Sequence, residues 1–432
     1  MTPIQRGLAA ARGGFARSLA PTGKARSARP LKRAMILLAS MCGLFAALCG
    51  TQTTHAAQGL SLEMVYLTRA EKPRLSLAFV DPEVEDPGVW GARLALKDNQ
   101  TTGRFLGHTY SLREVVVPAD GDIAAAFEQE VASGHRYFIA DLAHDDLLAI
   151  ARAEGADGTL IFNGRAGETD LRTDTCFNHV FHTALSLAQR SDALMQFLVW
   201  KRWANVFLLS GTGPGDAAFA EAIRQSARKF GAEIVADEAY AYSPIARRTD
   251  SGHIQVQRQM PVATQGAGDD YDVLIVADEN DLFGEYLPFN THAPRPVAGT
   301  QGLAPLSWHR VQEQWGSTQF QNRFVAEAGR WMEERDYGAW LAVRAIGEAV
   351  TRTNTTDTGA VRAYLRSGDF ALGGFKGVGL SFRTWNQQMR QPVILTNKRV
   401  LVSVSPQPGF LHQRTKLDSL GYDQPETSCN LQ

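Results

Sequence analysis

Two periods of apolar residues alternate along the first part of the chain, and they predict strands and helices in turn. Short apolar or β-branched runs are separated by segments whose apolar residues recur at helical spacing. We expect strands at 61–67, 110–117, 137–142 and 158–163, with helices at 90–99, 123–133 and 145–153 between them. This β-α-β-α-β-α-β order is typical of a parallel sheet that carries helices on both faces.

A second series of the same kind follows the first. It comprises helix 187–203, strand 205–210, helix 216–230 and strands 233–240 and 271–277. Two α/β lobes in tandem explain a length of 432 residues better than one sheet of ten or more strands. Later helices are expected at 311–328 and 336–353, and a β-rich stretch at 380–404. These late elements must return to one lobe or the other, so the chain crosses several times between them.

The expected fold class is therefore α/β, with two doubly wound parallel-sheet lobes, a hinge of several crossings and a C-terminal extension. We assign 57–183 and about 306–372 to the first lobe, 184–305 and about 373–405 to the second, and 406–432 to a C-terminal tail. The stretch 247–270 does not fit the alternation. Because residues 253–257 (HIQVQ) alternate apolar and polar, they favour an extended ribbon where a helix is due.

Residues 1–56 have the three-part pattern of a secretory signal. They hold eight basic residues and no acidic one, followed by an apolar run over 34–50 and by small residues at Thr54 and Ala56. The alternative is a retained membrane anchor, since 17 residues approach the length of a membrane span. We favour cleavage near Ala56, because small residues end the run and no second hydrophobic segment follows. The remainder is then expected to be an exported protein with no direct membrane insertion.

Charge excludes one class of partner. The formal net charge is -1, but acidic residues outnumber basic ones by nine once the basic leader is removed. Binding to nucleic acid depends on clustered Lys and Arg side chains that displace counterions from phosphates. We therefore expect no nucleic-acid partner.

Two cysteines, Cys176 and Cys429, lie outside the leader. In an oxidising compartment they can pair, and Cys429 sits in a terminal tail that needs to be held. The alternative is two separate buried thiols. We predict a disulfide that fixes the tail to the first lobe.

The motif with the most specific pattern is Gly211-Thr212-Gly213-Pro214-Gly215-Asp216, between a predicted strand and a predicted helix. It resembles the start of a dinucleotide fingerprint, in which glycines bring the backbone close to a pyrophosphate. However, Asp216 replaces the third glycine and would repel a phosphate there. We favour an ordinary strand-to-helix turn in which Asp216 is the N-cap, with a dinucleotide site as the alternative.

No pattern for catalysis or metal binding is evident. The chain lacks the H-E-x-x-H, G-x-S-x-G and paired-cysteine motifs. His179 and His182 have a spacing that would place them on opposite faces of a strand, so they are expected to act independently. We expect no enzyme activity, no cofactor and no metal site.

Polar residues follow several predicted strands at their carboxyl ends, where open α/β sheets bind ligands. Each one taken alone is more typical of a helix cap or a solvated loop, but together they would face a cleft between the lobes. The candidate ligand-binding residues are Asp141, His144, Asn163, Arg165, Asp216, Asp278, Glu279 and Thr300.

The order of elements resembles that of type I periplasmic solute-binding proteins of the branched-chain amino-acid-binding branch. The residues that carry this resemblance are 91–99, 162–164 and 216–235. Several strings are more similar to the substrate-binding proteins associated with pyrroloquinoline-quinone (PQQ)-dependent alcohol dehydrogenases. These strings are 66–69, 101–105, 199–203, 248–252, 283–288, 308–310 and 410–415. The resemblance implies a monomeric two-lobed binder of a small solute in the periplasm, which works with the permease and ATPase subunits of an ABC transporter.

The resemblance also bears on the ligand. In amino-acid binders of this kind, loops after the third and fourth strands hold the ligand carboxylate, and here those positions are 141–144 and 164–166. They have lost a hydroxyl donor and gained an acid, and only Arg165 can replace the lost anion contact. Four candidate carboxylates against one guanidinium favour a cationic or hydroxyl-rich ligand. We rank a small polar organic solute first and a metal ion second. An exported NAD-type oxidoreductase and a sensor or interaction protein with the same fold remain the alternative functions.

Overall fold

The first sheet has five parallel strands in the order β2-β1-β3-β4-β5. The computed structural model describes residues 59–71, 84–242 and 253–431, so the predicted signal segment 1–56 lies outside the described residues. The strands are β1 (Ser61–Arg69), β2 (Thr109–Val117), β3 (Tyr137–Asp141), β4 (Leu160–Asn163) and β5 (Val180–His182).

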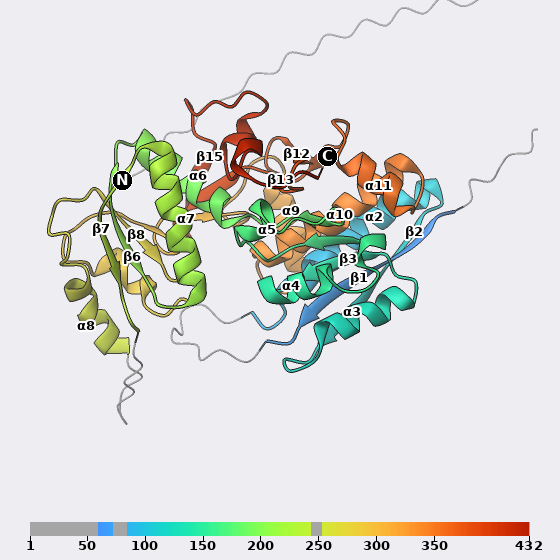
Figure 1. The fold of residues 1–432 in the computed structure, drawn as a ribbon, viewed down its shortest axis with the longest axis horizontal. Helices are drawn as coiled ribbons and strands as arrows, with labels where there is room; N and C mark the ends of the chain where they lie inside the picture. Colours follow the sequence, from blue (N-terminus) through green and yellow to red (C-terminus); the bar gives the residue numbers. More distant parts are fainter. Residues whose placement is uncertain (1–58, 72–83, 243–252, 432) are drawn as a thin grey trace, which may run out of the picture. The chain divides into compact units, whose positions relative to one another are not determined.

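Both faces of this sheet are covered by helices (Figure 1). Helices α2 (Val89–Leu106) and α10 (Glu334–Thr353) pack on the face that Met64 and Tyr66 of β1 enter. Helices α3 (Ile123–Ala132) and α4 (His144–Ala151) pack on the face that Val65 and Leu67 enter. Successive side chains of a strand point to opposite faces, so a strand buried on both sides is a continuous apolar run. This is why the sequence pattern located these strands.

The second sheet has four parallel strands in the order β7-β6-β8-β9. They are β6 (Asn205–Ser210), β7 (Glu233–Ala239), β8 (Val273–Ala277) and β9 (Val297–Gly299). Helices α6 (Leu187–Trp200) and α7 (Pro214–Phe230) share one core with this sheet, and α8 (His253–Ala263) lies in the core on its other face. The predicted α/β fold with two parallel-sheet lobes is confirmed.

Two local predictions are wrong. The first helix does not end after Asn99, because α2 continues to Leu106 and ends at Gly107 in the left-handed region. Gly103 is an interior position of this helix, where an added Cβ would lie only 2.7 Å from the carbonyl oxygen of His108. The glycine therefore allows close packing and does not mark a helix exit.

The second error concerns residues 253–257, which do not form an extended ribbon. They begin helix α8, and its Val256 and Met260 are both buried in the core of the second sheet. Val256 and Met260 are four residues apart, so the helix places them on one face. The short run HIQVQ fits both periods, and packing against the sheet selects the helix.

Within the described residues, the chain crosses at three places between a core of the first lobe and a core of the second. The first crossing lies between Phe181 of the first lobe and Leu185 of the second. The chain returns to the first lobe between Ala298 and Trp308. It crosses to the second lobe again between Met389 and Val393. Near the last crossing lie short strands β11 (Leu372–Gly373), β12 (Gly379–Phe382) and β13 (Met389–Arg390), and then β14 (Val393–Thr396) and β15 (Leu401–Ser405). Strand β14 also pairs with β10 (Ala304–Leu306).

Buried polar side chains connect the first and the last of these crossings to one another. Gln391 Nε2 donates to the carbonyl oxygen of Thr183 at 2.9 Å, which joins the last crossing to the first. Lys376 Nζ donates to Gln391 Oε1 and to the carbonyl oxygen of Pro392, both at 2.8 Å. Burial lowers the pKa of Lys376 to about 7. Since buried polar groups are costly unless paired, these bonds fix how the crossing segments lie against each other.

The C-terminal tail is attached to both lobes. In the second lobe, Lys229 Nζ donates to the carbonyl oxygen of Gly421 at 2.9 Å, and Asp192 Oδ2 accepts from the Gly421 amide at 2.8 Å. In the first lobe, the tail is held by the Cys176–Cys429 disulfide, whose Cα atoms lie 5.8 Å apart. The predicted disulfide is therefore present in the structure. None of the helices in the described ranges has the length and hydrophobicity that a membrane-spanning segment needs.

The disulfide gives a first testable prediction. Thiol titration of denatured, unreduced protein that lacks residues 1–56 should detect neither Cys176 nor Cys429. Reduction should lower the free energy of unfolding by about 2–4 kcal/mol, because the bond closes a long loop of the unfolded chain. The Cys176→Ser/Cys429→Ser protein is the control and should be insensitive to reductant. Two titratable thiols in the unreduced protein would show that the bond does not form.

Candidate functional site

The carboxyl ends of the strands in both sheets carry polar residues, as predicted. Asp141 ends β3 and Asn163 ends β4 in the first lobe, while Asp278 follows β8 and Thr300 follows β9 in the second. The partners of each side chain decide whether it holds a loop in place or remains available to a ligand.

In the first lobe, a chain of alternating charges starts at Asp141. Its carboxylate is 2% exposed and accepts from Arg335 Nε at 2.9 Å, Arg335 Nη2 at 2.7 Å and Tyr66 Oη at 2.7 Å. Arg335 Nη1 also pairs with Glu71 at 2.6 Å, and Arg165 Nη1 pairs with the same Glu71 oxygen at 2.8 Å. Asp141 and Arg165 are thus brought into one cluster through Glu71 and Arg335.

The electrostatics of this cluster follow from burial and pairing. Burial opposes the charge of Arg335, but the Asp141 and Glu71 carboxylates outweigh that effect and raise the pKa of Arg335. Burial, together with the neighbouring Asp141 charge, raises the pKa of Tyr66 well above its usual value. The tyrosine therefore stays protonated and acts as a hydrogen-bond donor to Asp141.

In the second lobe, two of the predicted acids bind backbone amides. Asp278 is 2% exposed, and its oxygens accept from the amides of Leu282 at 3.0 Å and of Phe283 and Gly284 at 2.7 Å. The amide of Asp278 itself donates to Thr300 Oγ1 at 3.0 Å. Asp278 and Thr300 therefore shape the loops after β8 and β9.

Asp216 is not the N-cap, so that prediction needs correction. The N-cap of α7 is Gly213, and Asp216 is the third helical residue, whose Oδ2 accepts from the Gly213 amide at 2.9 Å. Its Oδ1 accepts from the Glu279 amide at 2.7 Å, which ties the start of the helix to the end of β8. The preceding Gly-Thr-Gly-Pro-Gly segment has the Pro at the first helical position, where the missing N–H costs nothing. The carboxylate thus occupies the place that a phosphate would need at this helix start.

Glu279 makes a different kind of contact. Its Oε1 pairs with Arg190 Nη1 at 2.9 Å, and the two side chains are 27% and 16% exposed. Burial opposes the charge of Arg190, but Glu279 and Glu334 raise the pKa of Arg190. This partly exposed pair is the counterpart, in the second lobe, of the Arg165–Glu71 pair.

The last two candidates are held within the first lobe. Asn163 Oδ1 accepts from the amides of Arg165 and Ala166, and its Nδ2 donates to the carbonyl oxygen of Ala166 at 2.7 Å, so it closes its own loop. His144 pairs through Nδ1 with Asp145 at 2.7 Å and through Nε2 with Asp170 at 2.8 Å. Burial opposes protonation, but these two carboxylates raise the pKa of His144. His144 shares no bond with the Asp141 cluster within the described part of the chain.

Sequence reasoning missed Glu71, Arg190 and Arg335. Arg190 lies in the first turn of α6, and Arg335 is the second residue of α10. A cation at a helix N-terminus is electrostatically unfavourable, so each arginine needs a carboxylate partner. Basic residues in the first turn of a helix were therefore the sequence feature that could have identified Arg190 and Arg335. Their presence also corrects the expected excess of acids, because three guanidinium groups pair with Asp141, Glu71 and Glu279. Asp216 and Asp278 are stabilised by hydrogen bonds from backbone amides.

Metal ligation finds no support at these strand ends. Within residues 59–71, 84–242 and 253–431, no three His, Cys, Asp or Glu side chains are grouped so that they could hold an ion. His179 and His182 have separate partners: His179 Nε2 lies 3.0 Å from the carbonyl oxygen of Ala151, and His182 Nδ1 lies 3.0 Å from Asn163 Nδ2.

Comparisons with known proteins add independent information. A family model described as periplasmic binding protein matches residues 81–398. A branched-chain amino acid ABC transporter periplasmic ligand-binding protein from Burkholderia xenovorans has a TM-score of 0.62 at 14% identity, over 79% of this chain and 95% of that one. A solute-binding protein of an ABC transporter from R. palustris, in complex with benzoate, has a TM-score of 0.59 at 11% identity, over 85% and 99%. No curated protein sequence matches the chain.

The pairing of Asp278 with three amides gives a second prediction. Asp278→Asn should lower the free energy of unfolding by about 2–3 kcal/mol, because the new NH₂ group cannot accept from the backbone amides. Glu279→Gln is the matched control and should cost less than about 1 kcal/mol, since its ion pair is partly exposed. Urea denaturation of the three proteins measures both values. Equal stability of Asp278→Asn and the parent protein would mean that this carboxylate does not hold the loop.

Proposed function

The chain belongs to the periplasmic binding protein family, and from that premise we propose that it is the substrate-binding component of an ABC transporter system. It binds a small polar solute in the periplasm and presents it to the permease and ATPase subunits. The observation that carries this proposal is the pair of partly exposed ion pairs, Arg165–Glu71 and Arg190–Glu279, one at the strand ends of each lobe. In open α/β sheets, ligands bind outside the carboxyl ends of the strands.

The chemistry of these pairs favours a solute with both donors and acceptors. A simple anion that engages Arg190 would take this partner from Glu279, and a simple cation that engages Glu279 would take it from Arg190. Leaving a partly buried charge unpaired is costly. A net-neutral organic molecule that is hydroxyl-rich or zwitterionic can bond both members of each pair. We therefore rank such a solute before a cation or a metal ion.

The proposed roles of the eight candidate residues differ. Arg165 and Glu279 contact the solute directly, together with Glu71 and Arg190. The remaining candidates position loops and charges: Asp141 holds Arg335, and Asp216, Asp278, Thr300 and Asn163 fix the loops at the strand ends. His144 is the least connected member and is proposed to lie at the margin of the site.

A link to PQQ-dependent alcohol oxidation is a further part of the proposal. It is supported by the strings at 66–69, 101–105 and 308–310, which resemble the binding proteins associated with such dehydrogenases. Hydroxyl groups of an alcohol-derived solute would also suit the carboxylates of the two ion pairs. The chain itself is proposed to hold no cofactor. The alternative oxidoreductase function has less support, because Asp216 occupies the amide groups that a dinucleotide phosphate would need.

The test begins with the solute itself. Mass spectrometry of small molecules that co-purify with the protein should identify a polar organic compound, and calorimetry then measures its affinity. Glu279→Gln and Arg165→Gln should each weaken binding roughly tenfold, about 1.4 kcal/mol. Glu63→Gln is the control, because Glu63 lies near the amino end of β1 and pairs with His135. If only Arg165→Gln affects binding, the site is an anion site; if neither variant does, the solute binds elsewhere.

A further inference from the structure

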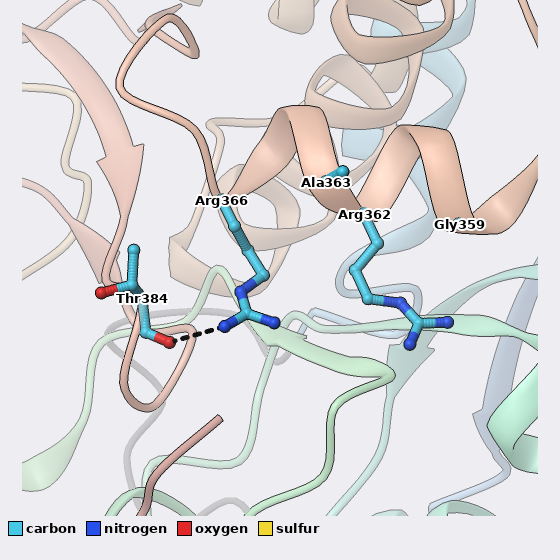
Figure 2. Close-up of a pocket in the computed structure, with 5 residues that line it drawn as sticks. All are labelled: Gly359, Arg362, Ala363, Arg366 and Thr384. Atoms are coloured by element: carbon cyan, nitrogen blue, oxygen red, sulfur yellow. Dashed lines mark hydrogen bonds between the residues drawn. The ribbon is translucent and has the colours of Figure 1, made fainter. Parts of the chain in front are cut away.

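A cavity of about 560 Å³ lies on the first lobe, outside the strand-end site. It is lined by Gly359, Arg362, Ala363, Arg366 and Thr384. Figure 2 shows both arginines extending from helix α11 (Thr358–Leu365) and its C-cap towards the same side, with Thr384 opposite Arg366. The small residues at 359 and 363 are one helical turn apart, so they leave the space between the arginines and the facing loop open.

The two arginines are held differently. Arg366 Nη2 donates to the carbonyl oxygens of Thr384, at 3.3 Å, and of Leu431, so its guanidinium group is fixed in place. Arg362 Nε is buried and has no hydrogen-bond partner, and within the described residues no ion pair holds its guanidinium group. A buried donor without a partner is rare in a folded protein. It indicates that the Arg362 guanidinium group needs a hydrogen-bond acceptor at this position.

Among the described residues, no acidic side chain lines the cavity. Asp357, the N-cap of α11, is engaged elsewhere, because it accepts from the Ala360 amide at 2.8 Å. Burial and the charge of Arg362 together lower the pKa of Arg366. Two like charges four residues apart on a helix destabilise it when nothing neutralises them. The cavity thus combines positive charge, an unpaired donor and free volume.

We propose that this cavity is a second ligand site, which takes the carboxylate or phosphate group of a small organic anion. Guanidinium groups bind such oxyanions with two parallel hydrogen bonds, and Arg362 has its donors available for this purpose. The volume lies within the range of small-molecule sites, so an organic body fits beside the charged group. The site is separate from the proposed solute site, because none of its residues belongs to the strand ends.

Inorganic phosphate is the probe for the test. The Nε–H signals of arginine in ¹⁵N-labelled protein report binding during a phosphate titration at constant ionic strength. The expected result is a saturable shift of two arginine signals. Arg362→Gln should weaken the response at least tenfold, while Arg352→Gln should leave it unchanged. Arg352 is an exposed arginine paired with Glu348 on the adjacent helix, so it controls for the change in net charge. A parallel titration with acetate distinguishes a preference for carboxylate from one for phosphate.

A second variant keeps the proposal falsifiable if Arg362→Gln does not fold. Ala363→Glu places a carboxylate beside both arginines without removing either, and it should abolish the phosphate response and leave the protein folded. Three outcomes would overturn the proposal. They are a shift that does not saturate below about 50 mM, an equal loss in Arg362→Gln and Arg352→Gln, and an undiminished response in Ala363→Glu.

Discussion

A buried carboxylate must find charged or amide partners inside the protein, and this requirement organises the ends of both sheets. Asp141, Asp216 and Asp278 are each at most 2% exposed. An ionised acid in such surroundings is strongly unfavourable unless it is paired and hydrogen-bonded. Asp141 meets the requirement with Arg335 and Tyr66, and the other two meet it with backbone amides of neighbouring loops. The loops at the strand ends are therefore fixed before any solute binds. Only the more exposed charged side chains remain available to determine which solute binds.

The same requirement operates where the chain crosses between the lobes. Three buried glutamines join the first and last crossings. Gln189 donates to the carbonyl oxygen of Met389 at the last crossing. Gln388 and Gln391 donate to the carbonyl oxygens of Ala184 and Thr183 at the first. In the tail, Asp418 is buried between Arg383 and Arg390, with Nε–Oδ1 distances of 3.0 and 2.8 Å. These contacts connect the tail to the segment that leads into the last crossing. Any change in the angle between the lobes must preserve these bonds or replace them.

The strands and most helices could be predicted from sequence because each core face leaves a regular apolar pattern. Strand β6 (Asn205–Ser210) was located at its observed bounds for this reason. The end of α2 could not be predicted in this way. Gly103 is required because a side chain there would meet residues 108 and 110, and the sequence around Gly103 does not show this contact.

Candidate acids at the strand ends were also identifiable, since position relative to a strand is a property of sequence. Their partners were not, because Arg335 is nearly two hundred residues from Asp141. Asp278 uses main-chain amide groups, which every residue except proline possesses. Counting charged residues along the sequence therefore gave too large an excess of acidic over basic side chains at the site.

Hydrogen–deuterium exchange with and without the co-purifying solute reports on both lobes in one experiment. If the solute binds at the strand ends, exchange slows in the loops after β3 and β4 (141–144 and 163–166) together with those after β8 and β9 (278–284 and 299–301). Protection of one lobe alone, or protection confined to α11 and the loop at Thr384, would contradict the proposal that the solute binds between the strand ends of the two lobes.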